Sequence, residues 1–248
     1  MPETVGTNRL VFLHGFTQTH HHWHSGALAI GAALGSRPSL AFVDLPGHGL
    51  SDADQADITS AAGALPALAG RGTWVGYSMG GRHALLAAVS GAPEIERLVL
   101  IGATAGLDDS DERAERAKLD RERADRIEAI GVDAFVDEWL GAPMFSRLPR
   151  DERDVSHRRR NTAAGLAHSL RTASTGVQPA IWDRLEAIEI PVLVLAGEHD
   201  RKFTDLGRSL AERIPGATFT SVAGAGHAAH TEQPAATAAI VARWLRAG

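Results

Sequence analysis

A serine flanked by glycines, in "GYSMG" at residues 76–80, is the stretch of this sequence best suited to nucleophilic or proton-transfer chemistry. An apolar run, Thr73–Tyr77, leads into it, and a helical pattern, Met79–Ser90, follows it. Glycines let a chain turn sharply from a strand into a helix, and such a turn holds the serine oxygen above the sheet. This context, more than the short motif itself, makes Ser78 a candidate catalytic residue.

An activated serine needs a base, and the base needs a carboxylate that orients it. After a serine on such a turn, the acid comes next in the sequence and the histidine comes last. The stretch "VLVLAGEHD" places Asp200 just after an apolar run, with Glu198 as the alternative acid. The stretch "VAGAGH" places His227 after the last apolar run, with His230 as the alternative base. We therefore predict a triad of Ser78, Asp200 and His227.

Two further loops follow the first two apolar runs. In "LHGFTQT", the backbone N–H of Phe16 is placed to act with that of Met79, so that both stabilise one developing negative oxygen. In "DLPGHGLS", the glycines indicate a turn, and we expect Asp44 to be structural rather than catalytic.

Arg82 lies four residues after the serine, so a helix that starts at the turn would put both on one face. Of the 25 basic residues 23 are arginine, so the position of an arginine is informative here and its abundance is not. A guanidinium binds carboxylates in a bidentate manner, which predicts an acidic group on the substrate. The alternative is an arginine on the helix surface.

Strands and helices alternate along most of the chain and must position these residues. The predicted strands are Arg9–Leu13, Leu40–Val43, Thr73–Tyr77, Leu98–Ile101, Val192–Ala196 and Thr218–Val222. The predicted helices are Ile58–Leu68, Met79–Ser90, Leu206–Arg213 and Pro234–Arg246. Such alternation is typical of an α/β fold with a mostly parallel, doubly wound sheet.

The alternation stops over residues 104–189, which are helical in pattern and highly charged. Either this segment is a solvated coil, or it is a helical lid inserted in the core. Apolar residues give it faces that can dock: Trp139, Phe145, Leu166, Leu170 and Trp182. We favour the lid, and we predict a core made of residues 1–103 and 190–248.

Composition limits the class of partner. The 248 residues carry a net charge of −5, which argues against nucleic acid or an anionic membrane as the partner. There is no cysteine, no apolar run of membrane-spanning length, and no secretory signal at the N-terminus. We expect a cytoplasmic protein that acts on a small molecule.

A histidine tract, "HHHWH" at residues 20–24, suggests a metal site at first sight. Adjacent histidines are expected to point in divergent directions, and familiar zinc patterns use a helical spacing and a third ligand. We therefore expect a solvated loop or helix start there, and no metal.

The motifs together resemble a known superfamily. The pieces "LHGFTQT", "DLPGHGLS", "GYSMGGR", "GEHD" and "GAGH" resemble the α/β-hydrolases along the whole chain. A narrower set, "YSMGGR", "ERAER", "FVDEWLGAPMF" and "GLAHSLRTASTGVQPAIW", resembles the 2-succinyl-6-hydroxy-2,4-cyclohexadiene-1-carboxylate synthases of menaquinone biosynthesis. Ser174 departs from that pattern, which has glycine there.

The narrower resemblance implies an α/β-hydrolase fold and a lyase. That lyase eliminates pyruvate from 2-succinyl-5-enolpyruvyl-6-hydroxy-3-cyclohexene-1-carboxylate, without a cofactor, by proton abstraction through a serine–histidine–aspartate triad. Motif matching implies that Arg82, Arg116 and Arg158 hold carboxylates of a small poly-carboxylate substrate, with Arg160 as an alternative to Arg158.

By the same matching, Tyr77 and Trp139 would line the pocket. The alternative function is a serine hydrolase, a carboxylesterase or C–C bond hydrolase, acting on an acidic small molecule, because the triad suits both reactions. A non-catalytic binding protein is disfavoured, because the serine, acid, histidine and oxyanion loop are all present.

Overall fold

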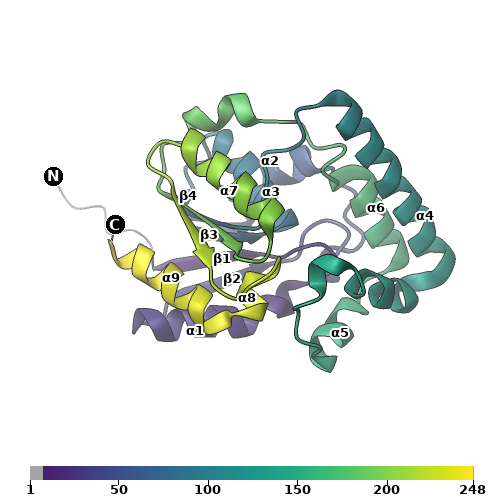
Figure 1. Cartoon of the computed structure of the whole chain (residues 1–248), viewed down its shortest axis with the longest axis horizontal. Coiled ribbons are helices and arrows are strands. Elements are labelled where there is room, and N and C mark those ends of the chain that lie inside the picture. Colours follow the sequence, from purple (N-terminus) through teal and green to yellow (C-terminus); the bar gives the residue numbers. More distant parts are fainter. Residues whose placement is uncertain (1–7, 248) are drawn as a thin grey trace.

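The computed structural model describes residues 8–247 and contains one six-stranded sheet with helices on both faces (Figure 1). The strand order is β2-β1-β3-β4-β5-β6, and each neighbouring pair is parallel. The strands are β1 (Arg9–Leu13), β2 (Ser39–Val43), β3 (Gly72–Tyr77), β4 (Ile95–Ile101), β5 (Val192–Gly197) and β6 (Thr218–Val222). Residues 1–7, for which the sequence predicts no secretory signal, lie outside the described part.

Two inner strands, β3 and β5, are buried along their whole length because helices cover both faces of the sheet. Every residue of β3 and β5 is buried. A strand covered on both sides has no polar face, which explains the continuous apolar runs seen in the sequence. The edge strands β2 and β6 keep exposed residues.

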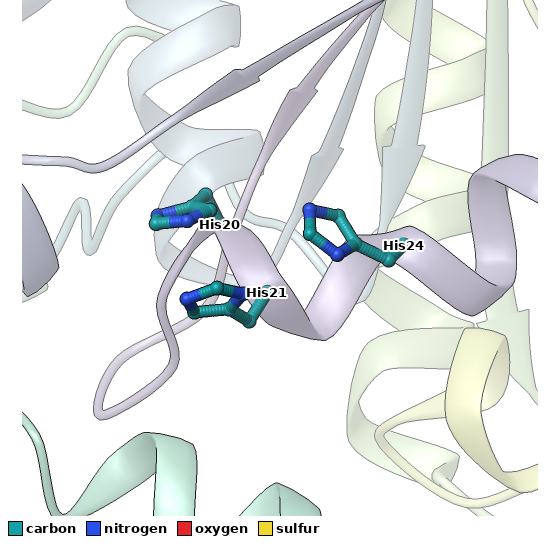
Figure 2. Close-up of side chains that lie close together, drawn as sticks. All are labelled: His20, His21 and His24. Atoms are coloured by element: carbon teal, nitrogen blue, oxygen red, sulfur yellow. The ribbon is translucent and has the colours of Figure 1, made fainter.

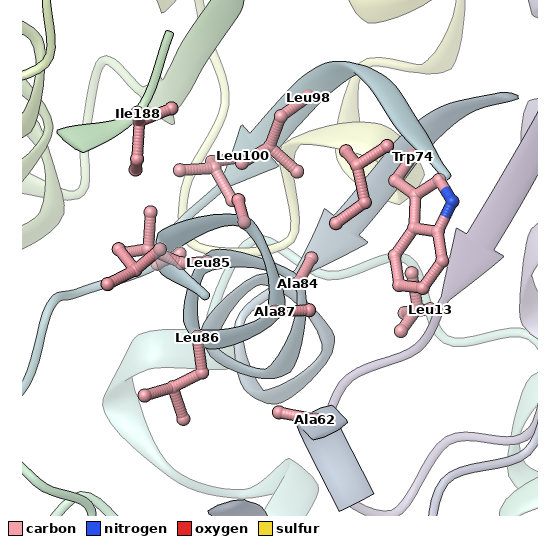
Figure 3. Close-up of a cluster of buried hydrophobic side chains, with 14 of the residues drawn as sticks. Leu13, Ala62, Trp74, Ala84, Leu85, Leu86, Ala87, Leu98, Leu100 and Ile188 are labelled. Carbon is pink, nitrogen blue, oxygen red and sulfur yellow. The ribbon is translucent and has the colours of Figure 1, made fainter. Parts of the chain in front are cut away.

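Two helical layers enclose the sheet. One face packs on α1 (His24–Leu34) and α9 (Pro234–Ala247), which lie side by side (Figure 1). The other face packs on α2 (Ile58–Ala69), α3 (Met79–Val89) and α7 (Arg201–Arg213). A short helix, α8 (Ala229–Glu232), precedes α9. Figure 3 shows Ala84, Leu85 and Ala87 of α3 packed against Leu98 and Leu100 of β4.

A helical segment follows β4 and returns the chain to β5. It contains α4 (Ser110–Leu140), α5 (Glu152–Arg158), α6 (Ala163–Ala173) and the 3₁₀ turns Pro143–Phe145 and Trp182–Ala187. Helices α4, α5 and α6 lie at one end of the molecule in Figure 1, whereas the Trp182–Ala187 turn packs on α3 and α7 of the core. Asp109 caps α4, because its side chain accepts the N–H groups of Asp111 and Glu112. Helix α4 breaks at Gly131, where φ is +79°. Leu166 and Leu170 are buried against α4 in a cluster of their own.

The predicted strands and helices are confirmed, with small shifts at their ends. The largest shift is in α7, which begins at Arg201 instead of Leu206 because the Asp200 side chain caps it through the N–H of Phe203. Helix α1 was not predicted beyond the helix start considered at the histidine tract, because its alanine- and glycine-rich sequence has no clear period. No helix within residues 8–247 is long and apolar enough to cross a membrane.

His230 is an ionisable group placed in the core. It is 4% exposed, and its ring packs against Trp23 and Tyr77 at centroid distances of 4.5 and 4.4 Å. Within the described residues neither ring nitrogen has a hydrogen-bond partner. Burial, assisted by the nearby His22, lowers the pKa of His230 to about 3, so the folded protein holds this ring neutral.

Replacing this histidine with an apolar ring, His230→Phe, should reduce the dependence of stability on pH by the contribution of this one group. In the wild type the pKa of His230 is lower in the folded state than in the unfolded state. The contribution of this group to the free energy of unfolding is therefore fully present above the unfolded pKa and is lost as the pH falls. That loss amounts to about 2 kcal/mol between pH 7 and pH 5 for one such group. Urea unfolding at both pH values measures it, and an equal loss in variant and wild type would contradict the assignment.

Candidate active site

The turn at Ser78 presents the hydroxyl at the end of the sheet. Ser78 has φ +50° and ψ −106°, a left-handed conformation that side chains rarely adopt. Its N–H donates to the carbonyl of Ile101 at 2.8 Å, which ties the turn to β4. The flanking glycines are required by space, because a Cβ on Gly80 would collide with the Leu13 carbonyl and one on Gly76 would lie 2.6 Å from the Gly81 Cα. The predicted strand–turn–helix context is present.

The predicted triad residues come together at the carboxyl ends of three strands. His227 Nε2 lies 3.2 Å from Ser78 Oγ, and His227 Nδ1 lies 2.6 Å from Asp200 Oδ2. A carboxylate can only accept, so Nδ1 carries the proton and Nε2 is free to accept the serine hydroxyl. Both alternatives are excluded by position, because Glu198 accepts the N–H of Gly224 and His230 is buried beneath Tyr77.

A carboxylate that was not predicted from the sequence holds the loop of the candidate catalytic histidine. Glu232 accepts the N–H groups of Gly226 and Ala228, the residues on either side of His227. Gly102, at φ +58°, leaves room for the ring, since a Cβ there would lie 3.0 Å from His227 Cε1. Nothing in the local sequence pattern indicated this bracing role for Glu232.

The predicted oxyanion donors lie beside the serine. Met79 is the first residue of α3, so its N–H has no acceptor within the helix. In the loop after β1, the N–H of Gly15 donates to Gln18 and that of Thr17 donates to His48, which leaves the intervening N–H of Phe16 unused within the described residues. Phe16 and Met79 both line the same cavity as the serine.

This cavity has a volume of about 400 Å³ and lies between the sheet and the helical segment. All the residues predicted for the site line it: Phe16, Tyr77, Ser78, Met79, Arg82, Arg116, Trp139, Arg158, Asp200 and His227. Arg160 lines a separate hollow on the surface, so the structure selects Arg158 over Arg160.

The carboxylates of buried Asp120 and half-buried Asp154 hold three of the cavity arginines in place. Asp120, whose side chain is 1% exposed, accepts Arg116 through one oxygen and Arg123 through the other. Arg158 donates to Asp154 at 2.8 Å and to the Thr17 hydroxyl at 2.6 Å. Fixed guanidinium groups bind an anion with less loss of side-chain entropy than mobile ones.

Arg82 differs from these three because no carboxylate within residues 8–247 forms an ion pair with it. The side chain is 8% exposed, and its Nη1 donates to the Gln178 amide oxygen at 2.9 Å. Burial, together with the charge of Arg116, lowers the pKa of Arg82 to about 9, which still leaves it charged at neutral pH. An unpaired buried charge is costly, so the site favours an anionic ligand next to the serine.

The cavity also contains polar residues that were not predicted. Arg123, Thr175 and Lys202 line it. Arg123 could have been found, because Arg116, Asp120 and Arg123 follow the helical spacing i, i+4, i+7. Within the described residues, Thr175 Oγ1 and Trp139 Nε1 have no hydrogen-bond partner, so both are free to contact a ligand.

Comparison with known proteins agrees with this fold. Residues 10–240 match the model described as "Alpha/beta hydrolase family". The chain belongs to this family. The fold predicted from the sequence, an α/β-hydrolase fold, is therefore confirmed. In such α/β sheets, functional residues lie on loops that follow the strands. The candidate triad lies on such loops here.

Several relatives that match nearly the whole chain are named as synthases. The chain is 35% identical to the 2-succinyl-6-hydroxy-2,4-cyclohexadiene-1-carboxylate synthase of Salmonella typhimurium, over 99% of this chain and 97% of that protein. It is 40% identical to a putative synthase of the same name from Bacillus subtilis, over 69% of this chain but only 64% of that protein. The structure of MenH from S. aureus matches with a TM-score of 0.88 at 30% identity, covering 98% of this chain and 96% of that one.

The triad assignment predicts how the serine reacts with a fluorophosphonate probe. Ser78→Ala should abolish labelling, because the nucleophilic oxygen is gone. Asp200→Ala should slow it by about a hundredfold or more, because His227 loses the group that orients its ring. Glu198→Ala is the matched control and should label at the wild-type rate. Slow labelling of Glu198→Ala, with normal labelling of Asp200→Ala, would transfer the acid role to Glu198.

Proposed function

We propose that this chain is a 2-succinyl-6-hydroxy-2,4-cyclohexadiene-1-carboxylate synthase, a lyase of menaquinone biosynthesis. The observation that carries the proposal is Arg82, a buried and unpaired guanidinium one helical turn from Ser78. The names of the relatives that match nearly the whole chain support the same function.

The charge of the substrate suits the cavity. The substrate, 2-succinyl-5-enolpyruvyl-6-hydroxy-3-cyclohexene-1-carboxylate, carries three carboxylates, on the ring, on the succinyl group and on the enolpyruvyl group. The cavity offers four guanidinium groups, those of Arg82, Arg116, Arg123 and Arg158. Planar guanidinium groups bind carboxylates through paired hydrogen bonds, and their fixed positions orient the ring. One carboxylate, as on a simple acidic ester, would leave most of these groups unused.

Proton abstraction starts the reaction. Loss of a C2 proton and of the C5 substituent converts the 3-cyclohexene ring into the 2,4-diene of the product. The C2 proton is acidic because the succinyl ketone is attached there. Ser78 Oγ takes this proton while its own proton moves to His227 Nε2, and Asp200 stabilises the imidazolium that forms.

Elimination follows from the same electron pair. Negative charge builds on the succinyl carbonyl oxygen, where the N–H groups of Phe16 and Met79 would stabilise it. A double bond then forms between C2 and C3, the ring double bond moves to C4 and C5, and the C5–O bond breaks. The departing enolate takes up a proton at carbon to become pyruvate. No oxidation state changes overall, so this reaction needs no redox cofactor.

The helical segment completes the site. Residues 104–189, which we propose as a lid, contribute Arg116, Arg123, Trp139 and Arg158 to the cavity. Closing these helices over the ring excludes water, which would strengthen the interactions between guanidinium and carboxylate groups. A cytoplasmic location and the lack of a nucleic-acid partner stay predictions from the sequence.

The function is tested by measuring pyruvate release from the enolpyruvyl substrate, beside hydrolysis of a panel of neutral esters. The triad suits a serine hydrolase equally well, so the comparison of the two substrate classes decides. Rapid pyruvate release with slow ester hydrolysis is the expected result. The reverse preference would favour the hydrolase.

Removing the unpaired guanidinium should weaken the lyase reaction specifically. A hydrogen bond to a charged group contributes about 1.5–3 kcal/mol, so Arg82→Ala should lower kcat/KM for pyruvate release by about ten- to a hundredfold. Arg82→Lys keeps the charge but loses the planar fork, so it should restore only part of the activity.

The matched control is Arg126→Ala, on the exposed face of α4, where Arg126 pairs with Glu138 outside the cavity. This variant should keep wild-type activity. Thermal unfolding of all three variants separates loss of binding from loss of fold. Wild-type pyruvate release by Arg82→Ala would show that this arginine holds no substrate carboxylate.

A further inference from the structure

The histidine tract folds into a cluster on the side of the sheet that carries α1. His20–Trp23 form a 3₁₀ turn, η1, and α1 starts directly after it at His24. One ring nitrogen from each of His20, His21 and His24 lies within 4.8 Å of the other two (Figure 2). The expectation that adjacent histidines diverge is therefore wrong here. The rings of His20 and His21 lie 4.0 Å apart between centroids, and the ring of His24, three residues after His21, lies 5.3 Å from that of His21.

A buried carboxylate fixes the protonation of the first ring. His20 Nδ1 lies 2.6 Å from Asp44 Oδ2, and the Asp44 side chain is 4% exposed. Asp44 also accepts the backbone N–H groups of His20 and Leu50, so it is structural, as expected. Since the carboxylate only accepts, Nδ1 carries the hydrogen and Nε2 keeps its lone pair. A histidine that binds a metal is usually held by such a carboxylate on its other nitrogen.

The other two rings have free nitrogens. Within the described residues, no hydrogen bond involves the ring nitrogens of His21 or His24, and both rings reach solvent. His157 of α5 stacks on His21, with centroids 4.2 Å apart and planes within 18°, which limits rotation of the His21 ring. None of the three clustered histidines lines the catalytic cavity.

We propose that His20, His21 and His24 bind one divalent transition-metal ion, with Zn²⁺ as the preferred ion. Imidazole nitrogens suit Zn²⁺, Cu²⁺ and Ni²⁺ better than they suit Mg²⁺ or Ca²⁺. Three histidines and one water would complete a tetrahedral zinc site, in which Zn–N distances of about 2.0–2.1 Å place the nitrogens about 3.3 Å apart. Each nitrogen has to move inward by less than about 1 Å from the present spacing, which small side-chain rotations supply.

The ion would lie outside the reaction cavity, so we expect it to stabilise the fold without entering the reaction. It would join η1 to the first turn of α1, and through Asp44 it would also fix the loop after β2. A ligand that binds only the folded state raises the apparent stability, so the unfolding temperature should rise with the Zn²⁺ concentration.

The test is calorimetric titration of Zn²⁺ into the untagged full-length protein, with metal analysis after dialysis. The wild type should bind one equivalent. His21→Ala and His24→Ala should each weaken binding by at least about tenfold, since each removes a ligand. His168→Ala, a half-buried histidine of α6 outside the cluster, is the matched control and should bind like the wild type.

The catalytic histidine is the rival ligand, and His227→Ala should therefore also keep full binding. Co²⁺ supplies a second readout, because a tetrahedral site with nitrogen ligands gives visible absorption that His21→Ala should remove. Circular dichroism checks that each variant is folded. Absence of Zn²⁺ binding by the wild type, or binding that survives in His21→Ala and His24→Ala but is lost in His227→Ala, would overturn the proposal. Pyruvate release is measured separately, so neither result depends on the other.

Discussion

The backbone of Ser78 is the constraint on which the rest of the site depends. A non-glycine residue with a positive φ costs about 1–3 kcal/mol, and it persists only where the surroundings hold it. Here the N–H bond to Ile101 and the complete burial of α3 hold it. Because the turn is so tight, α3 starts directly at the end of β3. The serine oxygen then meets His227, which lies in the loop after β6. Arg82 lines the same cavity one helical turn further on.

The arginines of the cavity differ in whether a carboxylate compensates their charge. Asp120 and Asp154 neutralise and orient Arg116, Arg123 and Arg158, so these side chains are fixed before any ligand arrives. Arg82 has only a neutral amide as partner. Asp120 and Asp154 also reduce the net positive charge of the cavity, which lowers the electrostatic free energy of holding these arginines close together. The group left without a carboxylate partner among the described residues is Arg82, one helical turn from the serine, where the proposed substrate would need a carboxylate held during proton transfer.

The loop after β1 connects the catalytic site with the histidine cluster. Phe16, whose N–H is the proposed oxyanion donor, lines the cavity, and three residues after Thr17 the chain enters η1 with His20. Thr17 has a positive φ of +66°, and its hydroxyl and carbonyl are bound by Arg158 and Asn161 of the helical segment. A change in the helical segment therefore acts on the oxyanion loop through direct hydrogen bonds. Through this contact Arg158, a buried arginine of α5, belongs to the site and not to the protein surface.

The sequence by itself determined the strands, the serine turn and the order of the triad. Each depends on local periodicity or on the fixed chain order of this fold, and both can be read along the chain. Only the tertiary structure decided three other features. It selects Arg158 over Arg160, it leaves Arg82 without a carboxylate partner in residues 8–247, and it brings His20, His21 and His24 together. Arg158 meets Thr17 across 141 positions, and Arg82 meets Gln178 across 96. Neighbouring arginines and histidines look alike in a sequence, and their roles differ only because folding buries one side chain, exposes the next and sets which distant atoms they meet.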